Sequence, residues 1–525
     1  MDRRACASYW RVVLVGLIVL LLGACGQAEE KASTAATPTH EPAATSTHEP
    51  TATPTHEPAV TPTHETTAAP RWEPAESKVN ASAGSREEYG FLVVPEDRTQ
   101  PDSKMIRLHA VVIRSRSEDP KPDPVVFLAG GPGASALAAV SHVRDILSAI
   151  LRDRDLVVAD QRGVGFSEPA LDCPEYGEAV RETYGADVSS EEAQERMFDA
   201  MRACRDRLMA EGVNLAAYTS ATSAADVHDL MQALGYERYN LYGGSYGTRL
   251  ALTIMRDYPD EVRSAVLDSV EPLQVDALEM RAVVVQQAFE RVFEQCASSE
   301  TCNQKHLDLA GTFFSLVERL EEEPLPVDVR GTIYHVGGGE FIEMILMRML
   351  EPSGISGLPN LIDQAADGQT SWLAPQVEMV LSLYPRILWE GMANSVMCAE
   401  EVPFNSPEDA EEINSGVHPA IVRGVEADNL PWLAEVCEMW GAAEADPVED
   451  EPVQVDVPAL ILTGEFDPFV PLDFANAAAE YLPKAQSFVI PGHSHDVLSS
   501  STCAREIMKQ FLDAPEEAPD TSCLE

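Results

Sequence analysis

The chain has 525 residues, of which 45% are hydrophobic, and its formal net charge is −49. This length and apolar content are enough for one large folded domain with additions. The negative charge repels phosphate groups and therefore argues against nucleic acid as a partner, whereas solubility is its simplest role.

Residues 1–24 are predicted to be an export signal. Three arginines precede an apolar run at residues 12–22, which is shorter than a membrane-spanning helix requires. The run ends in Leu-Gly-Ala-Cys, which resembles the lipobox of bacterial lipoproteins. That resemblance implies cleavage before Cys25, a lipid on the Cys25 sulfur, and an exported protein anchored to the membrane at its extracytoplasmic face. An ordinary signal peptide followed by a chance cysteine is the alternative.

Residues 25–85 are expected to form a disordered tether. The segment is rich in Thr, Ala, Pro, Glu and His, and the motif Thr-His-Glu-Pro or a variant recurs with a period of eight, starting at residues 39, 47, 55 and 63. Such a sequence has almost no apolar side chains to bury and remains extended. It would act as a stalk between the lipid and a folded domain.

Short apolar runs from about Tyr89 onward predict β-strands. The runs are Phe91–Val94, Ile106–Ile113, Val125–Leu128, Leu156–Ala159, Tyr239–Tyr242, Val266–Leu267, Leu460–Thr463 and Phe488–Ile490. Helical stretches lie between the later runs; one begins at Thr222 or Ser223 and ends at Gly235. Strands that alternate with helices predict an α/β fold with a mostly parallel central sheet and helices on both faces.

The strand signal weakens over residues 272–450, where helix-like segments dominate. We interpret this region as an inserted helical lid, because strand-like sequence resumes after it. Residues 86–271 and 451–525 are then the two parts of one core.

Ten cysteines occur, and eight of them follow the predicted tether. An even number in an exported chain suggests disulfides, although the sequence alone permits many pairings. Proximity along the chain favours the pairs Cys296–Cys302 and Cys503–Cys523. The remaining cysteines would then form Cys173–Cys204 and Cys398–Cys437. The chain has no Cys-x-x-Cys pair, so a structural zinc site is not expected.

Ser245 is the candidate nucleophile. It lies in Gly243-Gly244-Ser245-Tyr246-Gly247, which matches the pattern G-x-S-x-G between a predicted strand and a predicted helix. A strand, a sharp turn and a helix form the nucleophile elbow of a serine hydrolase, and the glycines relieve crowding in that turn. A tight turn with a capping serine is the structural alternative.

The serine hydroxyl needs a base, and the base needs a carboxylate to orient it. The acid is expected after a late strand, and Asp467 in the stretch ALILTGEFDPFVP has this position. Asp268 is an alternative acid, whereas Glu465 is expected to be structural or solvated. The base is His493 or His495 in FVIPGHSHDVLSS, and position alone does not separate them.

An acyl-transfer reaction also needs N–H donors for the oxyanion. The N–H of Tyr246 follows the nucleophile directly and is one candidate. The second donor should follow an early strand, and the run Gly130-Gly131-Pro132-Gly133 after Val125–Leu128 supplies Gly131.

Several motifs together resemble the proline iminopeptidase and tripeptidyl aminopeptidase group of α/β-hydrolases, over most of the chain from about residue 89. They are GGPG, DQRGVGFSEP, GGSYGT, GEFDPFVP, PGHSHDV and, near the C-terminus, APDTSCL, which is similar to the tail of the exported tripeptidyl-aminopeptidase-like branch. The late motif of the family resembles P-G-x-G-H-G-V and places the base on His495, with Ser494 and Asp496 where the family has glycines. Arg162 is expected to brace the oxyanion loop through Asp160.

The resemblance implies a serine peptidase that removes residues from the free N-terminus of a peptide, with no metal or organic cofactor. Such an enzyme needs an anion for the substrate amine, and Glu400 and Glu401 in the lid resemble the acidic segment of the family. An esterase on the same fold and an inactive hydrolase scaffold that binds at the surface are the competing hypotheses. The oligomeric state is not predicted.

Overall fold

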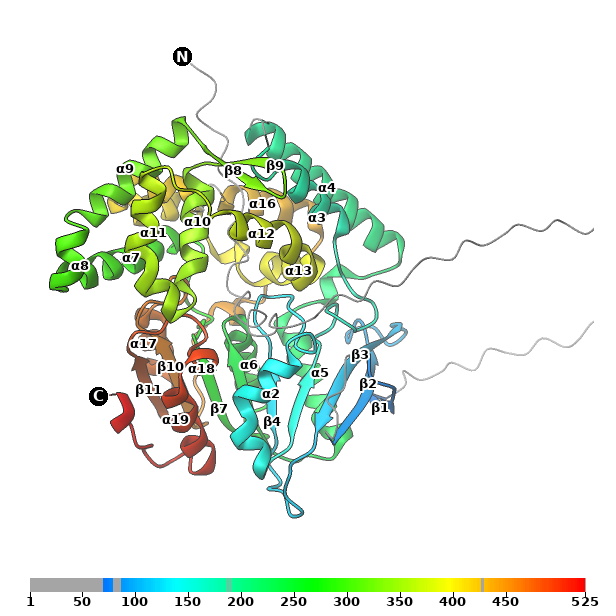
Figure 1. The fold of residues 1–525 in the computed structure, drawn as a ribbon. Helices are drawn as coiled ribbons and strands as arrows, with labels where there is room; N and C mark the ends of the chain where they lie inside the picture. Colours follow the sequence, from blue (N-terminus) through cyan, green and yellow to red (C-terminus); the bar gives the residue numbers. More distant parts are fainter. Residues whose placement is uncertain (1–68, 79–85, 187, 189, 426–428, 525) are drawn as a thin grey trace, which may run out of the picture.

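A computed structural model describes residues 69–78, 86–186, 188, 190–425 and 429–524 (Figure 1). The predicted signal peptide, the lipidation site Cys25 and most of the predicted tether lie outside these residues. No helix within the described ranges is both long and apolar enough to cross a bilayer.

A nine-stranded sheet forms the core of the molecule, in the order β1-β2-β3-β5-β4-β6-β7-β10-β11. Six neighbouring strands from β5 to β11 run parallel, and β1, β2 and β3 add an antiparallel edge. Each strand predicted from the sequence lies within or overlaps one of these strands. The bounds are β1 Arg71–Pro74, β2 Glu87–Pro95, β3 Met105–Ile113, β4 Val125–Leu128, β5 Leu156–Ala159, β6 Tyr239–Gly244, β7 Val262–Asp268, β10 Ala459–Gly464 and β11 Ala485–Ile490.

Helices cover both faces of this sheet because its central strands are apolar on both sides. In β4, Val125 and Phe127 pack into one buried cluster, while Val126 and Leu128 pack into the other. Alternate residues of a strand point to opposite faces, so a fully apolar strand requires two covering layers. One layer contains α2 (Val140–Ile146) and α19 (Thr502–Asp513), and the other contains α5 (Ser220–Leu234), α6 (Tyr246–Asp257) and α17 (Leu472–Tyr481).

A helical cap lies over the carboxyl ends of the parallel strands (Figure 1). It has its own apolar core, built around side chains such as Phe289, Phe313 and Phe341. A short hairpin of β8 (Leu325–Val329) and β9 (Thr332–Val336) belongs to it and was not predicted. Its helices are α7 Arg281–Ser298, α8 Glu300–Lys305, α9 Leu309–Glu322, α10 Gly338–Met349, α11 Pro352–Ala366, α12 Ala374–Ile387, α13 Glu390–Glu400, α14 Pro407–Ile413, α15 Pro419–Gly424 and α16 Asn429–Trp440.

The cap also contains residues that the sequence analysis assigned to the core over 86–271. Helices α3 (Pro174–Thr183) and α4 (Ser190–Ala210) pack against α12 and α16 of the cap rather than against the sheet. Their apolar side chains share one buried cluster with α13 and α16. The cap is thus built from two separate stretches of chain, which the strand pattern could not indicate because both stretches simply look helical.

The predicted tether is too long at its C-terminal end. Residues 71–74, which fall within the 25–85 segment, form β1 and pair antiparallel with β2. Trp72 packs against the core, and a Cβ atom at Gly90 would stand only 2.2 Å from the Trp72 ring. The pairing with β2 and the packing of one large aromatic side chain together hold a segment whose composition otherwise indicates disorder.

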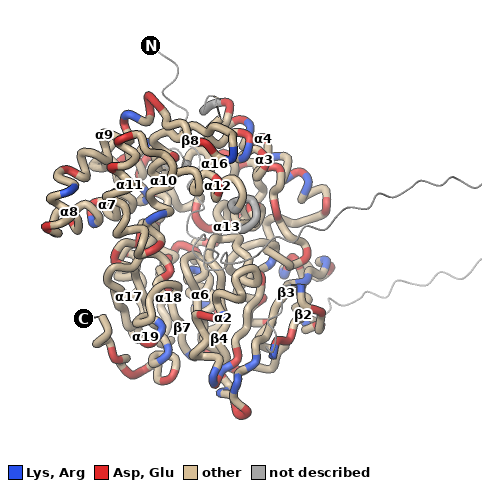
Figure 2. The backbone as a smooth tube through the Cα atoms, in the orientation of Figure 1, with Lys and Arg blue, Asp and Glu red and all other residues tan. Residues whose placement is uncertain are grey.

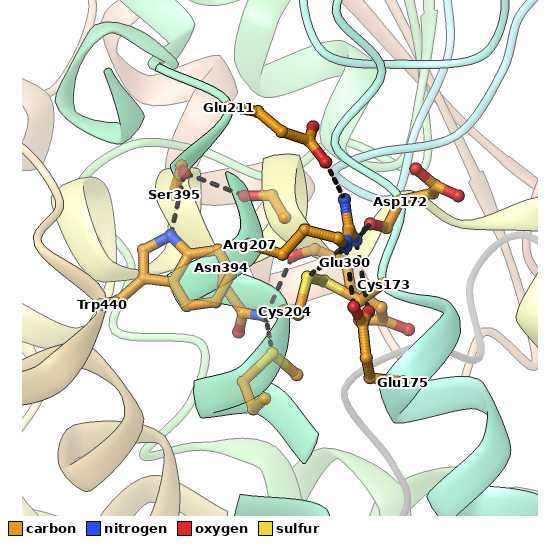
Figure 3. Close-up of a disulfide and its surroundings, with 12 residues drawn as sticks. Asp172, Cys173, Glu175, Cys204, Arg207, Glu211, Glu390, Asn394, Ser395 and Trp440 are labelled. Carbon is orange, nitrogen blue, oxygen red and sulfur yellow. Dashed lines mark hydrogen bonds and ion pairs between the residues drawn. A yellow bond between two sulfur atoms is a disulfide. The ribbon is translucent and has the colours of Figure 1, made fainter. Parts of the chain in front are cut away.

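All four predicted disulfides are present: Cys173–Cys204, Cys296–Cys302, Cys398–Cys437 and Cys503–Cys523. Figure 3 shows the first of them beside Arg207, which pairs with Glu175 at 2.7 Å and so ties α3 to α4 a second time. Disulfides form and persist in oxidising compartments, so these four indicate an extracytoplasmic protein.

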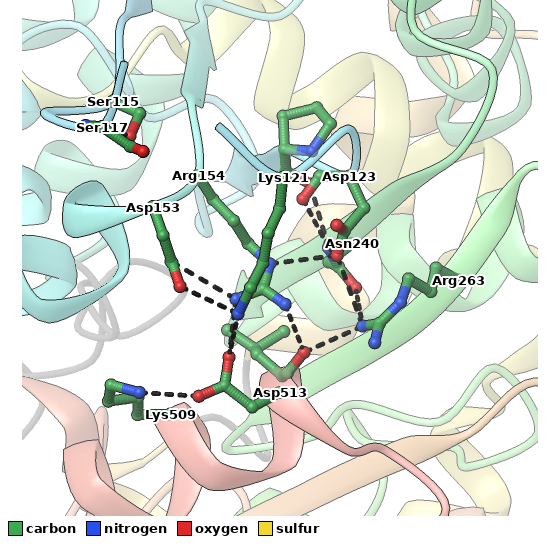
Figure 4. A network of polar contacts seen from close by, with 12 residues as sticks. Ser115, Ser117, Lys121, Asp123, Asp153, Arg154, Asn240, Arg263, Lys509 and Asp513 are labelled. Atoms are coloured by element: carbon green, nitrogen blue, oxygen red, sulfur yellow. Dashed lines mark hydrogen bonds and ion pairs between the residues drawn. The ribbon is translucent and has the colours of Figure 1, made fainter. Parts of the chain in front are cut away.

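The C-terminal part of the core is anchored by a buried cation. Arg154 donates to Asp123 at 3.0 Å, to Asp513 at 2.8 Å and to the carbonyl of Leu512 at 2.9 Å (Figure 4). These bonds fix the end of α19 close to the starts of β4 and β5, and so hold the C-terminal segment against the rest of the core.

Asp and Glu residues are spread over both the cap and the core (Figure 2).

Candidate active site

Ser245 lies at a strained turn between β6 and α6. Its φ is 54° and its ψ is −132°, a conformation that L-residues rarely adopt. Close packing holds the turn: a Cβ atom at Gly243 would lie 2.3 Å from the Gly247 carbonyl oxygen, and one at Gly247 would lie 2.1 Å from the Leu128 carbonyl oxygen. Only glycine fits at either place, so this is the geometry expected of a nucleophile elbow.

The two predicted oxyanion donors lie on the wall of the same cavity as Ser245. Tyr246 begins α6, where backbone N–H groups have no partner within the helix. Gly131 has a φ of 117°, and a Cβ atom there would stand 2.8 Å from the N of Gly133. The side chain of Tyr246 is engaged elsewhere, in a hydrogen bond of 2.8 Å with Ser220, which leaves its N–H as the group available to a ligand.

Asp160 braces the loop that carries Gly131. Its carboxylate accepts hydrogen bonds from the Ser135 hydroxyl at 2.8 Å, the Leu137 N–H at 3.0 Å and the Phe166 N–H at 2.8 Å. The expectation that Arg162 acts through Asp160 is wrong: Arg162 makes a bidentate pair with Asp226, at 2.7 and 2.8 Å. Asp226 comes from α5, a distant segment that the motif containing Arg162 could not reveal.

Asp467 and His495 form a buried pair. His495 Nδ1–H donates to Asp467 Oδ2 at 2.9 Å, and the other oxygen of Asp467 accepts the N–H groups of Phe469 and Val470, each at 2.9 Å. Burial raises the pKa of Asp467, but the attraction of His495 outweighs it and leaves that pKa below its ordinary value. Burial lowers the pKa of His495, but Asp467, Asp496 and Glu271 outweigh it and raise it to about 9. Nε2 of His495 is buried and has no hydrogen-bond partner among the described residues.

Asp268 connects this pair to the nucleophile. Its carbonyl oxygen accepts the Ser245 N–H at 3.0 Å, and its carboxylate accepts the N–H groups of Val497 and Leu498, each at 2.9 Å. Asp496 packs so closely on the elbow that its oxygen lies 2.9 Å from the place of a Gly244 Cβ atom. Distant segments therefore meet here, with His495 carried by the loop that Asp268 holds.

The other candidates for base and acid have structural partners instead. His493 is partly exposed and its Nδ1 contacts the carbonyl of Pro491 at 2.8 Å. Glu465 accepts the N–H of Gly492 at 2.7 Å. Asp268 is occupied by the backbone bonds described above, so it is not placed to orient an imidazole.

Ser245 has a hydrogen-bond partner that the sequence analysis missed. Its hydroxyl donates to Glu271 Oε1 at 3.1 Å, so in this structure the nucleophile contacts a carboxylate rather than His495. Burial raises the pKa of Glu271, with His495 and Arg249 acting in the opposite direction. The sequence did contain one indication of a role for Glu271, since this residue follows the end of β7 by three positions. Ligand-binding groups gather at the carboxyl ends of parallel strands.

The two lid glutamates differ in their surroundings. Both contact Arg249, which is buried: Glu401 pairs with it at 2.5 Å, and Glu400 lies 3.8 Å away. Glu401 lines the cavity beside Ser245, whereas Glu400 is buried behind it and accepts the Ser220 N–H at 2.5 Å. Burial outweighs Arg249 and raises the pKa of each carboxyl to about 7.

The cavity has a volume of about 130 Å³ and is bounded by both core and cap. Its lining combines polar and charged side chains with apolar ones, and both the core and the cap contribute to it. Its lining includes Gly131, Ser245, Tyr246, Arg249, Glu271, Val275, Leu278, Arg281, Val396, Met397, Glu401 and Phe469. A nucleophile, an oxyanion site and an acidic subsite thus share one cavity, which is partly open to solvent.

Comparison with known proteins supports the same group. Profiles described as "alpha/beta hydrolase fold" and "TAP-like protein" match residues 123–337 and 425–523. Serine protease Hip1 of Mycobacterium tuberculosis is 24% identical over 477 residues, covering 84% of this chain and 88% of Hip1. Tripeptidyl aminopeptidase of Streptomyces lividans is 32% identical over 192 residues, covering 34% and 35% of the two chains. Carboxylesterase B of M. tuberculosis is 30% identical over 257 residues, covering 46% and 48%.

The sheet order, the cap over the carboxyl ends of the parallel strands and both profile matches lead to one conclusion. The chain has the α/β-hydrolase fold and is a serine hydrolase, similar in sequence to TAP-like proteins, serine protease Hip1 and tripeptidyl aminopeptidase.

Proposed function

We propose that the protein is an exported aminopeptidase that cleaves peptides from their free N-terminus through an acyl-enzyme. The observation that carries this proposal is the acidic subsite beside the nucleophile, where Glu271 contacts the Ser245 hydroxyl at 3.1 Å and Glu401 lines the same cavity. Such a subsite suits the protonated amine of a peptide, because a charge-assisted hydrogen bond in a dry site is strong. The peptidase names of two relatives support the same substrate class.

In the proposed reaction Ser245 Oγ attacks the scissile carbonyl carbon, and His495 Nε2 takes the hydroxyl proton. Asp467 holds the imidazole in the tautomer that this transfer requires and stabilises the imidazolium. The N–H groups of Tyr246 and Gly131 bind the oxyanion. His495 then gives its proton to the leaving amine, and water, activated by the same imidazole, releases the acyl group.

The carboxylate beside the nucleophile favours a cationic substrate group. Arg249 pairs with Glu401 at 2.5 Å, and Arg281, the other cation on the cavity wall, donates to a backbone carbonyl at 3.1 Å. A bound ammonium would pair with Glu271 next to Ser245. A neutral ester gains nothing from this arrangement, which separates the proposal from the esterase hypothesis that Carboxylesterase B keeps open.

The test compares peptide p-nitroanilides with a free amine to the same compounds after N-acetylation. We expect Ser245→Ala to abolish hydrolysis and acetylation to lower kcat/KM by about 100-fold, the cost of losing a charged hydrogen bond in a buried site. Equal rates on free and acetylated substrates would refute the aminopeptidase and favour the esterase. A wild-type protein that hydrolyses neither peptide nor p-nitrophenyl acetate would be an inactive scaffold.

A further inference from the structure

We infer that Glu271 anchors the ammonium group of the very residue whose carbonyl Ser245 attacks, so that the enzyme releases one residue at a time. This inference rests on the proposed aminopeptidase function and adds the length of the product. It differs from what the name of the tripeptidyl aminopeptidase relative would suggest, and it depends on where the carboxylate stands relative to the nucleophile.

The number of residues that are released fixes the distance between the substrate amine and the scissile carbonyl carbon. In an amino-acid residue the nitrogen lies about 2.5 Å from the carbonyl carbon, since the two bonds that join them are about 1.5 Å each. Each further residue in an extended peptide adds about 3.4 Å, so the amine of a tripeptidyl group lies about 9 Å from the scissile carbon. Glu271 Oε1 is 3.1 Å from the Ser245 oxygen that will bond to this carbon. A carboxylate so close to the nucleophile reaches the amine of the first residue and not that of the third.

The charge of Glu271 is available for this role. The carboxylate forms no ion pair with Lys or Arg within the described part of the chain, and the partner that it holds, the Ser245 hydroxyl, is neutral. Glu401, in contrast, is paired with Arg249 at 2.5 Å. Of the two carboxylates on the cavity wall, Glu271 is therefore the one that makes no direct pair with Lys or Arg, and the nearby charges of His495 and Arg249 oppose the rise of its pKa by burial.

The cavity beside the reacting carbonyl is partly open to solvent and has apolar side chains in its walls. The walls include Val275, Leu278 and Phe469, so the first residue is expected to be apolar.

Binding of the amine would also release the nucleophile. The Ser245 hydroxyl donates to Glu271 in the structure, while Nε2 of His495 has no hydrogen-bond partner in the part of the chain that the structure describes. An ammonium that takes over Glu271 leaves the hydroxyl free to turn to His495, so a free N-terminus both holds the substrate and activates the serine. Glu271 is in this account a residue that binds substrate and sets the length of the product.

The first experiment follows the products of Leu-Ala-Ala-p-nitroanilide by mass spectrometry at early times. We expect free leucine as the first product, followed by alanine. Intact Leu-Ala-Ala appearing before any leucine would overturn the one-residue inference and leave the aminopeptidase proposal standing. Cleavage that continues at the same rate after N-acetylation would instead overturn the proposed function itself.

The second experiment measures how strongly Leu-p-nitroanilide is preferred over N-acetyl-Leu-p-nitroanilide. Glu271→Gln should lower this preference about 100-fold, because it removes the charge and keeps the shape. Asp276→Asn removes a neighbouring carboxylate that does not line the cavity, and should change the preference less than 3-fold because it does not reach the substrate amine. An unchanged preference in Glu271→Gln, or an equal fall in both variants, would refute the role given to Glu271.

Discussion

Substitution of Gly247 by alanine should damage both the fold and the site. The added Cβ atom would stand 2.1 Å from the carbonyl oxygen of Leu128 and 3.1 Å from that of Ala129. A normal contact between carbon and oxygen needs more than 3 Å, so α6 must move away from β4 by about 1 Å. Overpacking of this kind typically costs about 1–3 kcal/mol, and here the obstructing atoms are backbone and cannot rotate away.

A matched control is Gly357→Ala in α11. A Cβ atom there meets nothing within 4 Å, and the residue lies inside a helix. Alanine is favoured over glycine in a helix by about 0.5–1 kcal/mol, so this variant should be slightly more stable than the wild type. The two substitutions are chemically the same and differ only in what surrounds them.

The assay is urea denaturation followed by circular dichroism, together with kcat/KM on Leu-p-nitroanilide. We expect Gly247→Ala to lose about 1–3 kcal/mol in the free energy of unfolding. A shift of 1 Å at the start of α6 also displaces Ser245 and the Tyr246 N–H, which should lower kcat/KM about 100-fold. Wild-type stability and activity in Gly247→Ala would refute the packing described for the elbow.

Three further outcomes follow from the structure. On p-nitrophenyl acetate, which has no amine, activity should rise with pH to a midpoint near the His495 pKa of about 9, because only the neutral imidazole accepts a proton; a midpoint near 6.5 would show that the carboxylates around His495 do not act on it. Arg249→Met should destabilise the fold by about 3–5 kcal/mol above pH 7, and by less at pH 5, where the unpaired Glu400 and Glu401 are protonated; thermal unfolding at both pH values tests this, and an equal loss at both would contradict it. Serine substitution of both cysteines should cost about 4 kcal/mol for Cys398–Cys437, with a separation of 39 residues, and about 2 kcal/mol for Cys296–Cys302, with a separation of 6; calorimetry that gives the reverse order would refute the entropic argument.

The raised pKa of His495 also links stability to pH. An imidazolium held by Asp467 stabilises the folded state fully below the ordinary histidine pKa of 6.5, and this contribution is lost as pH rises through about 9. The pH range in which the base becomes active is therefore the range in which its ion pair with Asp467 weakens.

Much of the fold was predictable because its signals are local. The strand before Ser245 and the glycines around it are contiguous in sequence, and so are the apolar runs of the parallel strands. The boundary of the cap was not predictable, because α3 and α4 are helical wherever they pack, and only tertiary contacts place them with α12 and α16. The strand β1 depended on the packing of Trp72, which composition cannot reveal.

The site divides in the same way. Ser245 and Asp467 each follow a recognisable strand, so their order along the chain indicated their roles. Position left His493 and His495 equivalent as the base, and only the family motif favoured His495. The contact between Ser245 and Glu271 depends on how the loop after β7 turns back over the elbow, and no motif contains both residues. The pairing of Arg249 with Glu401 likewise joins the core to the cap, across a long separation in the chain.

The central claim is that His495 activates Ser245, and fluorophosphonate labelling mapped by mass spectrometry tests it most directly. The account predicts a single adduct on Ser245 in the wild type and in His493→Gln, since His493 is turned toward the carbonyl of Pro491. It predicts labelling at least 100-fold slower in His495→Gln, where the general base is missing. An adduct on another residue, or equally fast labelling of Ser245 in His495→Gln, would contradict it.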